Sequence, residues 1–545
     1  MDVISDQNWV LSVGTFLPMA GVLLMLFIPR GEEALHKRIA LLTAAATFAM
    51  GIVTLVLFDL DQTEKLQFYV DATWIEAIKS NYTIGLDGIS LPLYVLSSFI
   101  TLVVIIYTLD DMPEAGNPKA FLMLMLVLQT GMAGTFIAQD LILFFVFFEV
   151  VLLPMYFMIG VWGGEQRQYA SLKFFLYTMF GSALMLVAFL ALFAQTGAES
   201  FSFQHLMEAG PEIGRTVQIW IFAGMFIGFA VKVPMFPFHT WLPDAHTDAP
   251  TAGSVILAAV MLKMGTYGFL RFSLPIVPDA SRAFVPMMVV LSIIGIVYGA
   301  LVALAQKDWK RLVAYSSVSH MAMVMLGMFA LNPVGITGSI IQQLNHGIST
   351  GGLFLLVGIV YERRHTREIS EYGGLSKVMP VYAAIFLVMT MSSIGLPTLN
   401  GFIGEILILQ GVFVASKVWA AFAASGVVLG AAYMLYLYQR TMFGKVENPK
   451  NERLLDIGQR EFATFAPLLV LAVWMGIYPA PFLRRLAPSV QQIVMRVSPQ
   501  YQAKYAECNP TPTADAIASS NNPAARFLSS IPCDVNGNPL PTERR

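Results

Sequence analysis

Four ionisable residues lie inside long apolar stretches of the sequence. They are Glu149 in LILFFVFFEVVLLPMYF, Lys232 in FIGFAVKVPMF, Lys263 in AAVMLKMGTYG and Glu405 in NGFIGEILIL. A charge at the centre of a bilayer costs at least about 2.5–3.5 kcal/mol on insertion scales, so each group needs a partner, water or neutralisation. Because water and neighbouring charges can switch such groups between charged and neutral forms, the pattern indicates a proton relay. The alternative is that static ion pairs hold the helices together.

Several other polar residues are weaker candidates for the same chemistry. His320 ends the run SSVSH and His346 lies in QQLNHGIST, and each could be either a relay member or a hydrogen-bonded core residue. Lys173, in SLKFFLYTMF, lies near the end of its apolar stretch and could extend to the membrane surface. His239 and His246 flank WLPDA, but their spacing matches no common metal site, so we expect no metal there.

The motifs that the sequence lacks restrict its energy source. No GxGxxG follows a predicted strand, no GxxxxGK[ST] occurs, and the two cysteines form no cluster. We therefore expect no dinucleotide, ATP or iron–sulfur site on this chain. A formal net charge of −2 gives no basic surface for nucleic acid. If the protein pumps ions, a partner or another ion gradient must drive it.

The composition predicts the elements that position these residues. The 545 residues are 56% hydrophobic and 12% charged, against about 25% charged residues in a soluble domain, and the mean hydropathy is +0.66. Unbroken apolar runs such as 11–28 are long enough for membrane helices, whereas a β-barrel would show short alternating segments. We predict an all-α polytopic membrane protein with about fourteen transmembrane helices. Their expected ranges are 9–28, 39–59, 89–109, 119–138, 141–162, 170–195, 216–236, 251–271, 284–305, 311–330, 334–361, 380–410, 417–438 and 460–482.

Two of these spans are interrupted by proline and glycine. KVPMFPF (232–238) breaks the seventh span and GLPTLNG (395–401) breaks the twelfth. Spans 4–8 and 9–13 form two sets of five, and an odd number of crossings inverts the second set. Because each broken span is fourth in its set, we predict inverted repeats with a transport site near the membrane midplane. Two unrelated proline kinks are the alternative.

This pattern divides the chain into five parts. We expect an N-terminal part with three spans and an external loop that holds a short hairpin at 61–88, then two repeats, a final span and a polar, loosely ordered tail. The boundaries are 1–112, 113–275, 281–445, 457–482 and 483–545. Lysine and arginine are more frequent in the connections on one side, which places both termini on the outer side of the membrane.

Several longer sequence motifs resemble those of a known family of membrane proteins. The stretches concerned are YTIGLDGISLPL (82–93), FFEVVLLPMYFMIGVWGG (147–164), KVPMFPFHTWLPDAHTDAPTAGSVILAAVMLKMGTYGFLRF (232–272), KRLVAYSSVSH (310–320) and GFIGEILIL (401–409). Between about residues 80 and 440 the chain resembles the antiporter-like, proton-conducting subunits of respiratory complex I. Glu405 resembles the pattern of subunit M (chain 4), because sister subunits usually have lysine there. Thr398 departs from the family, which usually has glycine at this position.

The resemblance implies a function and partners. The chain would be a proton-translocating membrane subunit of an NADH:quinone oxidoreductase, and so part of a translocase. FMN, iron–sulfur clusters, NADH and quinone would bind partner subunits, and this chain would carry no cofactor. Its partners would be other membrane-arm subunits, especially neighbouring antiporter-like subunits, in the inner membrane of a bacterium. The motifs are shared with multisubunit cation/proton antiporters and membrane-bound hydrogenases, which remain the alternative, and a purely structural scaffold is a third interpretation.

The resemblance also implies roles for the buried residues. Glu149 would modulate Lys232, Lys263 would be the central relay group, and Glu405 would lie on the exit side. His320 and His346 would line the hydrophilic axis that connects them. Lys173 is a further, weaker member of the predicted relay.

The two cysteines lie beyond the last predicted span. Cys508 and Cys533 stand in a segment rich in proline and asparagine that can loop back. If this tail lies in an oxidising compartment, as the charge bias predicts for a bacterial periplasm, a Cys508–Cys533 disulfide could form. Two unrelated free thiols are the alternative.

Overall fold

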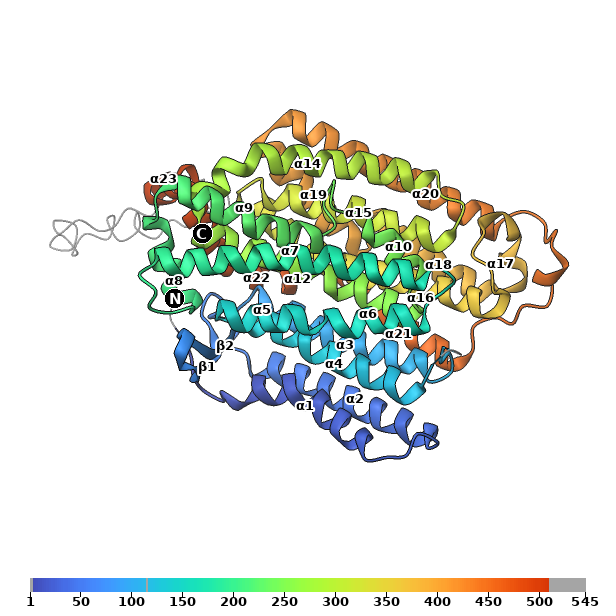
Figure 1. Cartoon of the computed structure of the whole chain (residues 1–545). Helices are drawn as coiled ribbons and strands as arrows, with labels where there is room; N and C mark the ends of the chain where they lie inside the picture. Colours follow the sequence, from blue (N-terminus) through green and yellow to red (C-terminus); the bar gives the residue numbers. More distant parts are fainter. Residues whose placement is uncertain (1–2, 114–115, 509–545) are drawn as a thin grey trace, which may run out of the picture.

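The computed structural model describes residues 3–113 and 116–508, and helices make up most of this part (Figure 1). Eleven of its helices or helix pairs are long and apolar enough to cross a membrane. This confirms a polytopic all-α membrane fold, while the count of about fourteen spans stays a prediction. The eleven are α1 (Trp9–Leu26), α2 (Glu33–Leu57), α3 (Ser90–Thr108), α4 (Pro118–Ile137), the pair α5 (Leu141–Val150) and α6 (Leu152–Trp162), α7 (Arg167–Gln195), the segment Thr251–Ile276, α14 (Pro278–Leu304), α16 (Pro333–Arg364), α20 (Lys417–Met442) and α21 (Gln459–Ile477).

The remaining elements are shorter or more polar. α9 (Arg215–Lys232) and α15 (Trp309–Met328) have the length of a span but carry more polar residues. α18 (Pro380–Ser393) and α19 (Asn400–Ala415) are short apolar helices. The rest are α8 (Phe203–Ala209), α10 (Trp241–Asp248), α17 (Leu375–Val378), α22 (Ala480–Val497), α23 (Pro499–Cys508) and the 3₁₀ turns η1 (Glu76–Ile78), η2 (Gly210–Glu212), η5 (Ile369–Glu371) and η6 (Pro449–Asn451).

Both helix breaks lie where the sequence predicts them. α9 ends at Lys232 before α10, and α18 ends at Ser393 before α19. Side chains bind backbone carbonyls at each break: Trp241 Nε1 donates to Val231 O over 2.9 Å, and Asn345 Nδ2 donates to Asn400 O over 2.7 Å. Broken backbone within a membrane needs such internal partners, because lipid offers none.

Thr398 adopts a left-handed backbone conformation, with φ of +80°. A positive φ of this size favours glycine, the residue that the family resemblance leads us to expect at this position. For a residue with a β-carbon, this conformation raises the conformational free energy by roughly 1–2 kcal/mol. The bend is therefore kept in this chain at a local cost.

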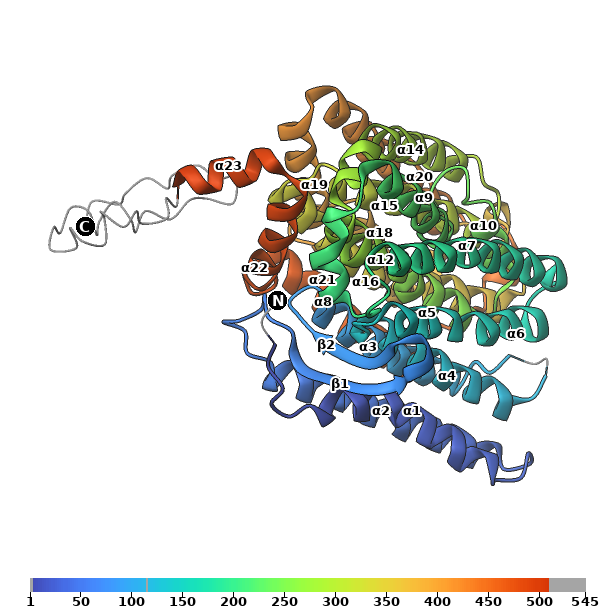
Figure 2. The ribbon, with the colours of Figure 1, turned by 60° about the vertical axis from the view of Figure 1, so that its left-hand side comes forward.

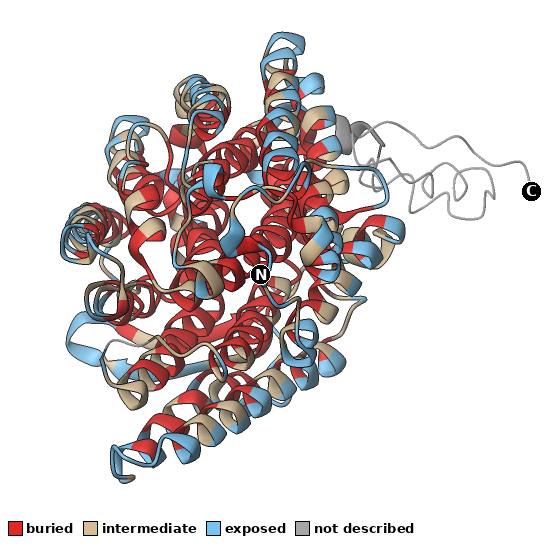
Figure 3. Ribbon diagram, turned by 90° about the vertical axis from the view of Figure 1, so that its right-hand side faces the viewer, coloured by how far each residue is buried: buried red, intermediate tan, exposed pale blue. Residues whose placement is uncertain are grey.

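The segment from Thr251 to Ile276 forms the centre of the bundle. It consists of α11 (Thr251–Ile256), the π-helical turn η3 (Leu257–Met261), α12 (Leu262–Gly268), a second π-helical turn η4 (Phe269–Ser273) and α13 (Leu274–Ile276). Figure 3 shows buried residues concentrated in the middle of the bundle and exposed ones on the outer helices. Gly268 makes the close packing possible, because an added β-carbon would lie 2.2 Å from the ring of Phe229 on α9.

One end of the bundle, which we call the hairpin end, carries an antiparallel hairpin of β1 (Gln67–Ile75) and β2 (Ser80–Leu86). This confirms the hairpin predicted for 61–88. Figure 2 shows α8 and α22 at the same end. Asp140 connects the hairpin to α5: its Oδ1 accepts from Ser80 Oγ over 2.9 Å and from Ile142 N and Leu143 N over 2.9 and 3.0 Å.

The chain beyond 483 differs from the prediction of a loosely ordered tail. α22 and α23 continue as helix to Cys508. The reason is the spacing of Leu486, Val490, Ile493 and Val494, which places them on one buried face of α22 against α13, α14 and α16. Because polar residues alternate with these apolar ones, the average composition of the segment does not reveal the amphipathic helix. The Cys508–Cys533 pairing lies outside the described residues.

The Asp140 contacts predict an effect on stability. Asp140→Ala removes the N-cap of α5 and its bond to the hairpin, which should cost about 1–2 kcal/mol. We expect a lower midpoint in thermal unfolding of the detergent-solubilised protein. Asp140→Asn keeps a side-chain oxygen that can cap the helix, so its thermal midpoint should fall much less than that of Asp140→Ala. Equal losses in the two variants would contradict the capping role.

Candidate functional site

Lys263 is a fully buried amine at the centre of the bundle. Its Nζ donates to the carbonyl of Ala258, in the π-helical turn η3, over 2.5 Å, and lies 2.8 Å from His346 Nδ1 on α16. A lysine ammonium has only donors, so His346 accepts at Nδ1 when Lys263 is charged. The hydrogen bond therefore couples the protonation of Lys263 to that of His346.

A row of polar side chains continues from His346 towards the second helix break. The rings of His346 and His320, on α15, have centroids 5.9 Å apart. His320 Nδ1 lies 3.7 Å from Glu405 Oε1 on α19, and its Nε2 lies 3.5 Å from Ser393 Oγ. Lys263, His346, His320 and Glu405 thus come together from four different helices, and we call them the central row.

The second break positions Glu405. Gly395 has a φ of +73°, and an added β-carbon there would lie 2.3 Å from Glu405 Oε2. Gly404 lets α19 approach α16, where Asn345 Nδ2 donates to Asn400 O over 2.7 Å. The break therefore supplies both the room for the carboxyl group and the polar partners of the interrupted backbone.

The first break positions Lys232 beside Glu149. Lys232 is the last residue of α9, and its buried Nζ lies 4.7 Å from the centre of the Phe148 ring. This is a cation–π distance. Among the described residues this amine has no hydrogen-bond partner. Glu149 is half-buried, and Ser182 and the charge of Lys232 are its polar neighbours.

Gly265 brings the helix of Lys232 against the helix of Lys263. An added β-carbon at this glycine would lie 3.0 Å from Lys232 Cβ, so α9 and α12 touch at this point. Lys263 lies two residues earlier on α12. The structure thus brings the predicted residues Glu149, Lys232 and Lys263 into one region and joins it to the central row.

Comparisons with known proteins agree with this arrangement. A family described as "NADH:quinone oxidoreductase/Mrp antiporter, TM" matches residues 138–430. The chain belongs to this family. Curated relatives include the NADH-quinone oxidoreductase subunit M of Rhodobacter capsulatus, 44% identical over 90% of this chain and 96% of the relative. The subunit M of Rickettsia typhi is 42% identical over 89% of this chain and 99% of the relative.

Two solved structures share the fold. A chain of respiratory complex I from Thermus thermophilus matches with a TM-score of 0.81 and 30% identity, over 90% of this chain and all of that chain. A chain of the Mrp complex from Dietzia sp. DQ12-45-1b matches with a TM-score of 0.77 over 90% of this chain and 98% of that one. Its identity is 19%, so this likeness shows the fold alone. The resemblance to antiporter-like subunits of complex I is confirmed.

Other predicted residues lie outside the central row. Lys173 Nζ forms an ion pair of 2.7 Å with Asp244 Oδ2 on α10, and Arg311 Nη2 lies 3.4 Å from the same carboxyl group. His239 is buried and packs against aromatic rings, and His246 stacks on Phe354 with ring centroids 4.6 Å apart. Within 3–113 and 116–508, no three His, Cys, Asp or Glu side chains group as metal ligands would.

Two basic residues that the predicted span boundaries leave at or beyond a span end, Lys310 before 311–330 and Arg271 at the end of 251–271, are buried instead. Lys310 donates from Nζ to Ala249 O over 2.5 Å. Arg271 is 2% exposed, its Nη2 lies 2.5 Å from Asp87 Oδ1, and its Nε donates to Tyr267 OH over 3.2 Å. The predicted span ended at 271, whereas the helix continues to Ile276. The spacing of Lys263, Tyr267 and Arg271, four residues apart on one helix, is the signal that could have revealed this face.

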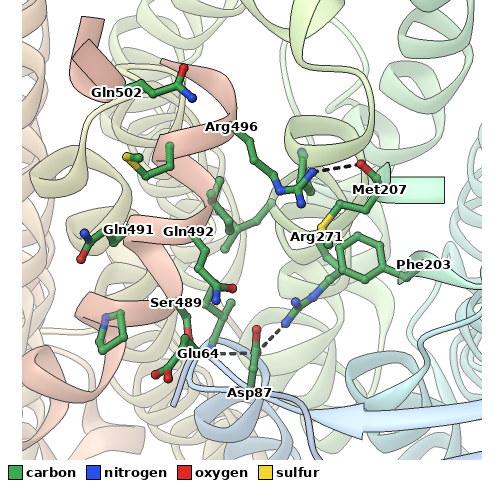
Figure 4. A pocket seen from close by; sticks show the side chains of 16 residues that line it. Glu64, Asp87, Phe203, Met207, Arg271, Ser489, Gln491, Gln492, Arg496 and Gln502 are labelled. Atoms are coloured by element: carbon green, nitrogen blue, oxygen red, sulfur yellow. Dashed lines mark hydrogen bonds and ion pairs between the residues drawn. The ribbon is translucent and has the colours of Figure 1, made fainter. Parts of the chain in front are cut away.

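The Arg271–Asp87 pair lies at the hairpin end. Figure 4 shows the two side chains pointing towards one another beside a cavity of about 590 Å³. Arg496 and Ser489 of α22 also line this cavity, as does Glu64. The pair therefore closes the inner side of a polar cavity, with α22 on the opposite side.

The buried pair predicts a large loss of stability on substitution. Asp87→Asn leaves the Arg271 guanidinium without a carboxylate, which should cost about 3–5 kcal/mol. We expect much less of the subunit in assembled membrane complexes, measured by native gel electrophoresis. Asp110→Asn is the matched control, because Asp110 pairs with Arg460 at an exposed position and such pairs contribute little. Similar losses in both variants would contradict the importance of burial.

Proposed function

We propose that this chain is a proton-translocating membrane subunit of an NADH:quinone oxidoreductase, with electron transfer on other subunits. The central row carries this proposal, since it lines up four neighbouring groups that can each bind and release a proton. The relatives named subunit M support it, because they match this chain over most of their length. The Mrp likeness offers a cation/proton antiporter as the alternative, but only through the fold.

Within the central row, we propose that protons move from Lys263 to Glu405. Lys263 gives a proton to His346 Nδ1 through their 2.8 Å hydrogen bond. A histidine can take a proton on one ring nitrogen and release one from the other, so His346 and His320 suit the intermediate positions. His346 Nε2 has no hydrogen-bond partner among the described residues and the two ring centroids lie 5.9 Å apart, so we propose that a bridging water or a ring rotation completes that step.

In the first half, we propose that Glu149 controls the charge of Lys232. A nearby carboxylate stabilises the ammonium form, and neutralising or moving it favours release of the proton. The contact at Gly265 places Lys232 next to the helix that carries Lys263. We propose that Lys263 receives the proton that Lys232 releases. Moving one charge across 100 mV costs about 2.3 kcal/mol, so changes in such pairs can gate the transfer. Lys173 stays a candidate member, held by Asp244.

We further propose the setting of this subunit. Both termini lie on the outer side of a bacterial inner membrane, and the neighbours are other antiporter-like subunits of the membrane arm. FMN, iron–sulfur clusters and the NADH and quinone sites belong to partner subunits. The two halves, 113–275 and 281–445, act as inverted repeats around the two helix breaks.

Lys232 provides the first test of this function. Lys232→Ala removes the switchable charge without burying a new one, so assembly should be largely preserved. NADH-driven proton pumping into membrane vesicles should fall at least about tenfold, as for loss of a proton-transferring group. Lys417→Ala, at the start of α20, is the control and should pump normally. Full pumping in Lys232→Ala would show that the relay assignment is wrong.

Glu149 provides the second test. Glu149→Gln preserves shape and hydrogen bonding but removes the negative charge beside Lys232. NADH:quinone turnover coupled to pumping should drop strongly, by roughly tenfold or more. Glu165→Gln, an exposed glutamate of the following connection, should leave the rate unchanged. Normal turnover in Glu149→Gln would favour a static, structural role for this carboxyl group.

A further inference from the structure

An apolar groove of about 460 Å³ lies between α2, α3, α16 and α21, away from the proposed relay. α2, α16 and α21 all pack against α3, which forms its floor. Apart from Thr63 and Arg485, its lining consists of apolar side chains and Gly88. A volume of this size lies within the range of about 300–1,000 Å³ typical of small-molecule sites.

The groove has the length of one bilayer leaflet. Along α2 and its C-cap, the lining runs from Phe48 to Phe58, about ten residues or about 15 Å of helix. The hydrocarbon core of a bilayer is about 30 Å thick, so one leaflet spans about 15 Å. The groove begins at the hairpin end and reaches mid-bilayer depth, as an acyl chain does.

The groove is open towards the surrounding membrane. Ile52 on α2 and Val470 and Trp474 on α21 line it and are 39%, 63% and 47% exposed. Its floor is closed, since Phe99 and Ile348 are only 8% and 2% exposed. A chain could therefore enter sideways between α2 and α21 and reach residues that bulk lipid does not contact.

Arg485 provides a charged group at the outer end of the groove. It lies in the first turns of α22, which begins at Ala480, three residues after α21 ends at Ile477, and thus at the level expected for lipid headgroups. Its side chain is exposed, and the described part of the chain shows no hydrogen bond or ion pair to its guanidinium. A guanidinium matches the geometry of a phosphate group.

We propose that this groove binds one glycerophospholipid, with an acyl chain between α2 and α21 and its phosphate on Arg485. The lipid fills the space between the N-terminal helices and the C-terminal α21 and α22. It thereby connects the two ends of the chain where their own side chains leave a gap.

Photocrosslinking in the assembled complex tests this site. The complex is reconstituted in nanodiscs with phosphatidylglycerol that carries a diazirine on one acyl chain, irradiated and mapped by peptide mass spectrometry. We expect labelling of the buried groove residues Phe99 and Ile348. Labelling confined to exposed positions on the outer helices would show ordinary annular lipid and overturn the proposal.

Two pairs of variants separate the headgroup contact from the groove. Arg485→Ala should reduce labelling of the groove roughly fivefold, while Arg484→Ala, an exposed neighbour outside the lining, should not. Ile52→Trp should block the groove and abolish that labelling, while Val56→Trp, exposed on the same helix, should not. Unchanged groove labelling in Ile52→Trp, or equal effects of the two arginine variants, would overturn the site.

The phosphate requirement is tested with a matched probe. Diacylglycerol with the same diazirine chain lacks the phosphate and should label the groove more weakly than phosphatidylglycerol. Equal labelling by the two probes would overturn the assignment of Arg485 as the phosphate contact.

Discussion

The rest of the structure depends on one constraint: a lysine amine that is completely buried in the middle of the bundle. Lys263 can remain there only with acceptors around it, and the surrounding helices supply them. The π-helical turn η3 brings the carbonyl of Ala258 to its Nζ, and α16 brings His346. Turns of this type are rare and frequently mark functional sites. Close packing at Gly265 and Gly268 then holds α12 against α9.

The two helix breaks extend this polar centre to both sides. Each break exposes backbone groups that lipid cannot satisfy, so side chains of the protein bind them, as Trp241 does at Val231 and Asn345 at Asn400. The same breaks end α9 at Lys232 and leave room for Glu405 beside Gly395. The features that interrupt the helices are thus the features that place ionisable groups at depth.

The sequence predicted the parts of this arrangement that depend on local pattern. Hydropathy revealed the helices, and proline and glycine revealed both breaks, because these residues act on the backbone next to them. Ionisable residues in apolar runs were conspicuous for the same reason. The contact between Lys263 and His346, 83 positions apart, depends on packing and was not predicted; the family resemblance implied only that both residues belong to one hydrophilic axis. Arg271 was misplaced because a helix end cannot be located to within a few residues from composition.

The central row can be tested most directly at His346, with a substitution that separates binding from relay. In His346→Gln, the amide oxygen can still accept from Lys263, but it cannot carry a proton onward. The measurement is the number of protons pumped per electron by the complex in proteoliposomes during NADH oxidation. Our account predicts that the complex assembles and oxidises NADH while this ratio falls. A ratio equal to that of the unmodified complex would contradict the proposal that protons pass through the central row.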